Sequence, residues 1–123
     1  MAFPIIASTA TTSDASGTAT PVTMPAGIVA GNLLVVLVAH GKAALSVPVG
    51  GGWEPLVETP FDAGGVSDLS LTIYGKIAVG ADTCSLVSTG EETVAVALRI
   101  TGHGVNDIDT IARDFARATS PPP

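Results

Sequence analysis

The sequence predicts an all-β protein in which short antiparallel strands form a sandwich or a barrel-like fold, and three observations support this prediction. The 123 residues include 14 Gly and 9 Pro, which together with Asp and Ser divide the chain into short runs rich in Val, Thr and Ile. Two of these runs alternate apolar and polar residues with the period of two that is typical of strands. The runs follow one another directly, so βαβ units and a parallel sheet are not expected.

The composition indicates a single globular domain and excludes several functional classes. Hydrophobic residues make up 46% of the chain and charged residues 13%, which is too hydrophobic for a disordered protein. The net charge is −6 without a basic cluster, whereas nucleic-acid binding depends on Lys and Arg. The longest uninterrupted apolar run, residues 33–39, is far shorter than the ~20 residues of a transmembrane helix. We therefore expect neither nucleic acid nor a membrane as a partner.

Three strands are expected in the first 40 residues. Residues 3–12 form the first, and residues 18–24 form an edge or irregular strand because Pro21 cannot donate to a ladder. Residues 33–40 form the strongest strand, and since its apolar residues are continuous, both of its faces are expected to be buried. A buried helix is the competing interpretation, but the β-branched valines and the flanking glycines favour a strand.

Four more strands are expected in the remainder, over residues 53–59, 68–79, 83–88 and 93–101, and the first of these is interrupted by Pro55. The alternation is clearest in residues 68–79, where one face of the strand is expected to point inward and the other to meet solvent or a partner. Its apolar row comprises Leu69, Leu71, Ile73 and Ile77, and its second row Ser70, Thr72, Tyr74 and Lys76.

The C-terminal segment is ambiguous between a helix and a strand. Residues 108, 111, 112, 115 and 116 are apolar, which is the spacing of one helix face. The chain ends on three prolines, a composition typical of linkers. We therefore divide the chain into a β-sandwich domain, residues 1–105, and a C-terminal extension or linker, residues 106–123. Whether the native chain continues beyond Pro123 stays open at this stage.

No catalytic, cofactor-binding or metal-binding residue is predicted, and the protein is not expected to be an enzyme. His40 and His103 are each followed by Gly and are expected at strand ends or in loops facing water. Cys84, the only cysteine, has no basic neighbour and is expected to be a small buried hydrophobe. Residues 106–109 suit helix capping better than calcium binding, since the Gly and Glu of an EF-hand loop are missing. Trp53 is expected to anchor the core or its rim.

The N-terminal residues 3–6, Phe-Pro-Ile-Ile, form an apolar arm. Such an arm either starts a strand or exposes hydrophobic surface that needs a partner. The sequence therefore favours a protein that acts by packing against and associating with a partner.

Several motifs, taken in order, resemble virion proteins of tailed bacteriophages and prophages. Residues 25–34 resemble the block P-x-G-x-x-x-G-D-L-L of that family, with Asn32 in place of the Asp. The G-W turn is matched by residues 52–53, the strand Y-x-K-x-A-x-G by residues 74–80, and a closing strand by residues 94–102. The resemblance covers residues 4–102 and implies a jelly-roll-like β-sandwich in the head decoration, tail or fibre of a phage particle. It carries over no catalytic residue, and the helical spacing after residue 107 is a departure from the extended strand of the relatives.

The expected function is that of a virion structural protein, a capsid decoration or cement protein that acts through subunit–subunit contacts. The resemblance implies other virion proteins, the major capsid or a tail protein, as partners, a homo-oligomer, and residence in the virion after synthesis in the host cytoplasm. The alternative is a tail or fibre module that binds carbohydrate or a host receptor, which requires Trp53 and Tyr74 to be exposed at one loop end. A hydrolase would require His40 or His103 beside Ser and a carboxylate.

Overall fold

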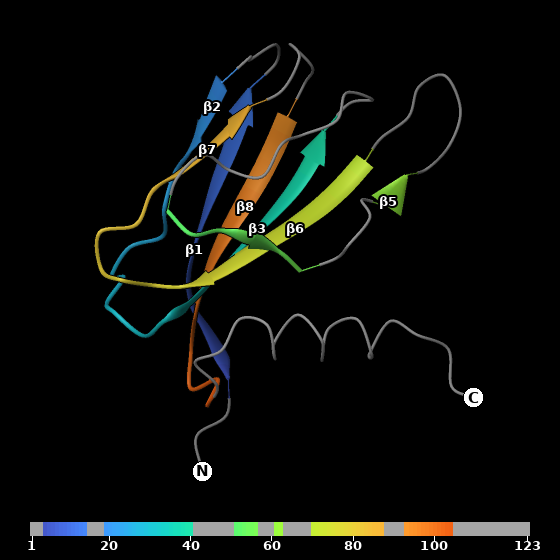
Figure 1. Ribbon diagram of the computed structural model, residues 1–123. Coiled ribbons are helices and arrows are strands. Elements are labelled where there is room, and N and C mark those ends of the chain that lie inside the picture. Colours follow the sequence, from blue (N-terminus) through green and yellow to red (C-terminus); the bar gives the residue numbers. More distant parts are fainter. Residues whose placement is uncertain are drawn as a thin grey trace, which may run out of the picture.

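The computed structural model describes residues 4–14, 19–40, 51–56, 61–62, 70–87 and 93–104, and within these residues the protein is all-β and contains no helix (Figure 1). The strands are β1 (Ile5–Asp14), β2 (Ala19–Val22), β3 (Leu33–His40), β4 (Glu54–Pro55), β5 (Phe61–Asp62), β6 (Ser70–Ile77), β7 (Cys84–Val87) and β8 (Thr93–Thr101). The predicted fold class, all-β and antiparallel, is confirmed.

The strands form two sheets in which every pair is antiparallel. The large sheet has the order β1-β8-β3-β6-β4, with β5 pairing to another part of β6, and the small sheet consists of β2 and β7. The first strand therefore pairs with the last, the second with the seventh and the third with the sixth. The small sheet lies against the β1–β8 side of the large one, because β2 contacts both β1 and β8 (Figure 1).

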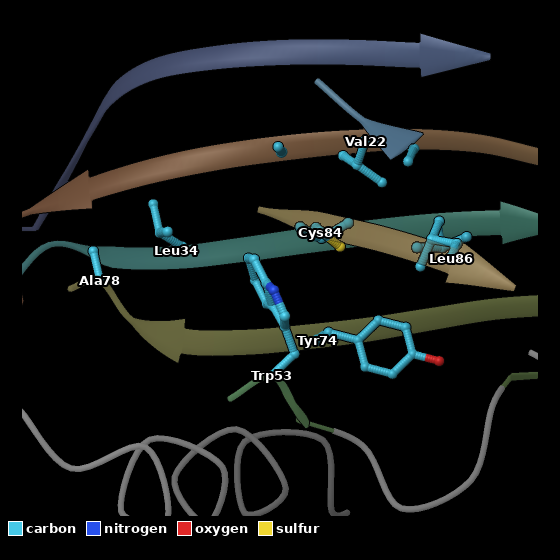
Figure 2. Close-up of a cluster of buried hydrophobic side chains, with 11 residues drawn as sticks. Val22, Leu34, Trp53, Tyr74, Ala78, Cys84 and Leu86 are labelled. Carbon is cyan, nitrogen blue, oxygen red and sulfur yellow. The ribbon is translucent and has the colours of Figure 1, made fainter. Parts of the chain in front are cut away.

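The core lies between the two sheets and is built from one face of each. Val36 of β3 is aligned with Tyr74 of β6 and with Ala97 of β8, so these three side chains share the inner face. Figure 2 shows the cluster, in which Cys84 and Leu86 of the small sheet approach the large sheet. Its members are Val22, Leu34, Val36, Val38, Trp53, Tyr74, Ala78, Cys84, Leu86, Ala95 and Ala97, with Met24 and Ile28 packed against them.

β3 is the central strand of the large sheet, as its continuous apolar sequence predicts. Leu34, Val36 and Val38 on its inner face are fully buried, and Leu33 on the outer face is buried as well. Val35 and Leu37, also on the outer face, are half-buried, so the predicted burial of both faces is confirmed for the inner face and only in part for the outer one. Since β8 and β6 pair on its two sides, the backbone of β3 is enclosed along with its inner side chains.

β6 forms where a strand was predicted, but the row of side chains that faces the small sheet is the more polar one. The row with Thr72, Tyr74 and Lys76 is turned toward the small sheet and buried, whereas Leu71 of the apolar row is partly exposed. The expectation that this polar row meets solvent or another subunit is therefore wrong for these three residues. Burial is tolerated because the polar atoms have partners, as the contact of Lys76 with Asp82 shows.

The predicted boundaries shift by a few residues, and one short strand is new. β1 begins and ends two residues later than predicted, and β2 and β7 are shorter. β5 lies between two predicted strands, in a stretch where no strand was expected, and its Phe61 aligns with Leu71 of β6. The predicted C-terminal extension, residues 106–123, including its helix-or-strand alternatives and its capping residues, lies outside the described residues.

Candidate functional site

The aromatic residues proposed for ligand stacking are both buried. Trp53 is 4% exposed and Tyr74 is 2% exposed, and both belong to the core cluster (Figure 2). The indole Nε1 of Trp53 donates a hydrogen bond to the carbonyl oxygen of Thr83 at 2.8 Å. Trp53 thus joins the segment before β4 to the segment before β7, in agreement with its predicted role as a core anchor.

A buried ion pair lies beside this tryptophan. The Nζ of Lys76 is 2.6 Å from Oδ1 of Asp82, and the two side chains are 6% and 0% exposed. Lys76 comes from the inner face of β6, and Asp82 from the connection between β6 and β7. The same ammonium lies 5.8 Å from the centroid of the Trp53 ring, within the range of a cation–π interaction. The pair was not predicted, because the six-residue separation of two common residue types carries no specific signal.

The Asp82 carboxylate also closes the turn that carries it. It accepts hydrogen bonds from the backbone N–H groups of Val79, at 3.1 and 3.2 Å, and Gly80, at 2.9 Å. Burial by itself raises the pKa of this carboxyl, but the hydrogen bonds from Lys76, Val79 and Gly80 and the positive charge of Lys76 together outweigh it, so the pKa lies below its ordinary value. The Asp82 carboxylate thus binds two backbone N–H groups of its own turn and the ammonium of Lys76. These contacts identify a structural ion pair.

Cys84 follows its prediction as a buried, inert thiol. It is 3% exposed and lies in the core cluster. Burial raises the pKa of Cys84 to about 12, although the positive charge of Lys76 acts in the opposite direction. A thiol with this pKa is protonated at neutral pH, so Cys84 has the environment of a packing residue and not that of a nucleophile.

Arg99 organises the connection between β2 and β3. Its Nε donates to Oγ of Ser8 at 2.9 Å, and Ser8 Oγ in turn donates to the carbonyl oxygen of Ala26 at 2.7 Å. A second guanidinium nitrogen lies 3.4 Å from Oδ1 of Asn32, a buried side chain that also accepts from the N–H of Val29 at 3.0 Å. Arg99 thereby ties β8, β1 and this connection together, and its donors serve protein oxygens.

The two histidines are not brought into a common site by any contact in the described part of the chain. His103 lies in the loop that follows β8, and its Nε2 is 2.9 Å from the carbonyl oxygen of Gly31, which precedes β3. His40 ends β3 at the opposite end of that strand, since Leu33 aligns with Ile100 and His40 with Thr93. A hydrolase built on these residues finds no support, and the described residues hold no cluster of His, Cys, Asp and Glu suited to a metal ion.

One end of the sandwich gathers exposed apolar side chains, and we call it the apolar end. Four residues define it: Ile5, Ile6, Val29 and Val79, which are 60%, 59%, 59% and 71% exposed. Ile6 aligns with Ile100 at the start of β1, and the N–H of Gly31 donates to the carbonyl oxygen of Ala78 at 2.9 Å, which brings the segments of Val29 and Val79 together. The predicted N-terminal arm thus does both things expected of it, because it starts β1 and also exposes hydrophobic surface.

The apolar end borders an edge of the large sheet. Among the described strands, β1 pairs only with β8, so its other side carries backbone groups without a neighbouring strand. Its ten residues contain neither Lys nor Arg nor Pro, which are the residues that commonly protect an edge against further pairing. An edge of this kind, next to exposed apolar residues, is suited to contact with another protein surface.

Comparison of the chain with protein-family models, with curated proteins and with solved structures found no match. Over the part of the chain that the structure describes, no helix is long and apolar enough to cross a membrane.

Proposed function

We propose that this protein is a structural component of a tailed-bacteriophage or prophage particle, where it acts as a capsid decoration or cement protein through contacts between subunits. The apolar end is the observation that carries the proposal. Single exposed apolar residues are common on proteins, but four of the six large exposed ones among the described residues lie at this end. A surface of this kind is suited to a permanent neighbour such as a capsid or tail protein, or a second copy of the chain.

The positions of the resembling motifs support the fold that the resemblance implies. Gly27 has a φ of 83° and an added Cβ would lie 3.3 Å from the guanidinium of Arg99, so the first motif supplies the tight connection before β3. The G-W turn places Trp53 in the core, and the motif with Tyr74 supplies the inner face of β6. The motifs therefore belong to the framework that joins the two sheets.

The nested strand pairing supports the jelly-roll-like form of this proposal. Pairing of β1 with β8, β2 with β7 and β3 with β6 is the pattern produced when a long antiparallel hairpin of strands is rolled into two facing sheets. The ends of β1 and β8 consequently meet, with Ile5 aligned to Thr101. A rigid body with both of these ends on one side is well suited to presenting that side to neighbours.

Assembly also explains how a modest surface is sufficient. In a particle, many copies bind at once, and each contact adds to an effective concentration that holds the others in place. The acidic net charge of −6 is compatible with an outward-facing position and unfavourable for packing directly on nucleic acid.

The alternative, a tail or fibre module that binds carbohydrate, requires exposed aromatic residues, and the two candidates are buried. Stacking on a sugar requires an exposed aromatic face, and Trp53 and Tyr74 are both in the core. A tail position without sugar binding differs from the leading proposal only in its neighbour, so the same experiment distinguishes the two.

The test is to purify particles from an induced culture of the strain that encodes the chain and to cross-link them before mass spectrometry. Cross-links between this protein and the major capsid protein are expected. Cross-links confined to tail proteins would move the protein to the tail. If particles with their full set of other virion proteins lack this chain, the proposed function is wrong.

A further inference from the structure

The edge of the large sheet at β1 is open to solvent. β1 stands at one end of the strand order, and among the described strands it pairs only with β8. No residue between positions 5 and 13 is buried. The exposed ones are Ile5, Ile6, Ala7, Thr9, Thr11 and Ser13, and the half-buried ones are Ser8, Ala10 and Thr12. The side chains at this edge are thus accessible to another strand.

Other edge strands of the described structure are protected against further pairing, and β1 is not. β2 contains Pro21, β4 contains Pro55, and β7 has only four residues, which are features that discourage the addition of a strand. β1 has ten residues. Its one irregularity is a shift of register between Ile6 and Ser8, so residues 8–14 form a regular edge.

The side chains of residues 8–14 alternate between the two faces of the sheet and are all small or short. Thr11 is aligned with Val96 on the outer face, and Ala10 with Ala97 on the inner face. The outer row is Thr9, Thr11 and Ser13, and the inner row is Ser8, Ala10 and Thr12. A second strand can therefore approach to the ordinary spacing of about 4.8 Å without meeting a bulky side chain.

This segment is compatible with its own sequence in the opposite direction. Residues 8–14 read Ser-Thr-Ala-Thr-Thr-Ser-Asp. When two copies run antiparallel about Thr11, the outer row places Thr against Thr and Thr against Ser, pairs that are favourable across strands. Such a pair has a two-fold axis and is closed after two subunits, so it does not continue into a fibre.

The charges of β1 also permit this register. Asp14 is the only charged residue of the strand, and pairing about Thr11 places it opposite Ser8 and not opposite its own copy. The two Asp14 residues then lie about 20 Å apart, well beyond the Debye length of about 8 Å at physiological ionic strength. The net charge of −6 on each chain opposes association in general, but no like charges meet within the strand pair.

We propose that two copies of this chain associate through residues 8–14 of β1, antiparallel about Thr11, so that their large sheets form one continuous sheet. A strand from another protein is the competing occupant, and the match of the segment with itself favours a second copy. A single strand pair is smaller than a standard interface of about 800 Å² per partner. The dissociation constant is therefore expected in the micromolar range.

The proposal does not depend on the proposed function. Ile5 and Ile6 of the apolar end precede the register shift, so they lie outside the paired segment. A monomeric variant should still present the apolar end to a particle. Failure of the dimer and failure of the virion assignment are therefore distinguishable.

The test is sedimentation equilibrium of the purified full chain from about 1 to 500 μM. Wild type is expected to dimerise. Thr11→Asp and Thr11→Lys each place two like charges opposite one another at the two-fold axis, so each variant alone should associate at least tenfold more weakly. An equimolar mixture of the two should associate again, because an Asp then faces a Lys. Circular dichroism and tryptophan fluorescence should match the wild type, since Thr11 is exposed.

Three results would overturn the proposal. The first is a wild-type chain that stays monomeric over the whole concentration range. The second is a mixture of Thr11→Asp and Thr11→Lys that associates no better than either variant alone, because only pairing about Thr11 brings these two positions together. The third is loss of the dimer in Ile6→Asp but not in Thr11→Asp, which would assign the contact to the apolar end.

Discussion

Lys76 and Asp82 are two opposite charges removed from water inside an aromatic-poor core. Each charge is costly to bury alone, and the 2.6 Å contact and the backbone donors of Val79 and Gly80 compensate for the lost hydration. Removal of one partner is therefore more harmful than removal of both. The pair lies next to an exposed turn, Gly80 and Ala81, so solvent screens it in part.

Asp82→Asn is expected to lower the free energy of unfolding at pH 7 by about 3 kcal/mol, the lower end of the range for a broken buried ion pair. The amide retains an acceptor for the turn but leaves the Lys76 ammonium without its counter-charge. Chemical denaturation followed by the fluorescence of the single tryptophan measures the change. In the variant that combines Asp82→Asn with Lys76→Met, most of the loss is expected to be recovered.

The same pair predicts how stability depends on pH. The pKa of Asp82 is lower in the folded protein than its ordinary value of 3.8, so its contribution to stability is complete above that value and is lost as the pH falls through the folded pKa. The stability difference between the wild type and Asp82→Asn should therefore be constant at neutral pH and shrink below about pH 4. A difference that stays constant down to pH 2 would contradict the assignment.

The thiol of Cys84 should be unreactive while the protein is folded. With a pKa of about 12, only about one thiol in ten thousand is ionised at pH 8, roughly a thousandfold less than for an ordinary cysteine. Reaction with a disulfide reagent at pH 8 should thus be very slow in buffer and fast in denaturant. Rapid labelling of the native protein would mean that Cys84 is neither buried nor protonated.

At the scale of elements, three of the described connections between strands are each held by one side chain. Arg99 joins β8 to β1 and to the connection before β3, Asp82 closes the turn between β6 and β7, and Trp53 reaches the carbonyl oxygen of Thr83. Asp82 and Trp53 bond directly to backbone groups outside the sheet ladders, and Arg99 acts through Ser8, whose Oγ donates to the carbonyl oxygen of Ala26. The turns are therefore parts of the framework and not independent loops.

Two adjacent glycines before β4 test whether this turn is part of the framework, because they have similar φ values and different surroundings. Gly51 and Gly52 have φ values of 77° and 73°, so alanine at either position costs about 1 kcal/mol in backbone strain. At Gly51 the added Cβ would also lie 3.1 Å from the carbonyl oxygen of Thr83 and 3.2 Å from Nε1 of Trp53, whereas at Gly52 it meets open space.

Gly51→Ala should therefore be less stable than Gly52→Ala by about 1 kcal/mol, the value of the hydrogen bond that it disturbs. It should also change the fluorescence maximum of Trp53, which Gly52→Ala should leave in place. Denaturation curves of the two variants give the stability difference. Equal stability and equal fluorescence would show that the hydrogen bond of Trp53 is not under this constraint.

At the scale of the whole molecule, the pairing of the first strand with the last brings the two chain ends of the sandwich to one side. The apolar end lies on that side, and Ile5 and Ile6 are its residues on the edge strand β1. Under the proposed function this surface contacts a neighbouring virion protein. Its residues should then matter for assembly and contribute little to the folding of the isolated chain.

Ile6→Asp is expected to change the free energy of unfolding by no more than about 0.5 kcal/mol, because Ile6 is already 59% exposed. Binding of the purified protein to particles that lack it should fall at least tenfold, as measured by co-sedimentation. Thr11→Asp is the control, since it places the same charge at an exposed position on the same strand. If both variants bind like the wild type, the apolar end is not the contact surface.

The sequence by itself determined the fold class, the approximate positions of the main strands and the burial of Trp53 and Cys84. These features depend on local patterns: the period of two, continuous runs of β-branched residues, and the separation of strands by Gly and Pro. The burial of β3 was predicted correctly for its inner face and only in part for its outer face, where Val35 and Leu37 are half-buried. The N-terminal arm was likewise correctly predicted to start a strand or to expose apolar surface.

Only the tertiary structure decided which strands pair and which face of β6 is the inner one. Alternation shows that a strand has two different faces, but in a sheet that is apolar on both sides the pattern does not say which face meets the second sheet. The burial of Lys76 depends on Asp82 and Trp53 arriving from other segments, and the network of Arg99 depends on Ser8, which is 91 residues away. Such contacts form between residues that are distant in the chain, and their free energy therefore leaves no local pattern in the sequence.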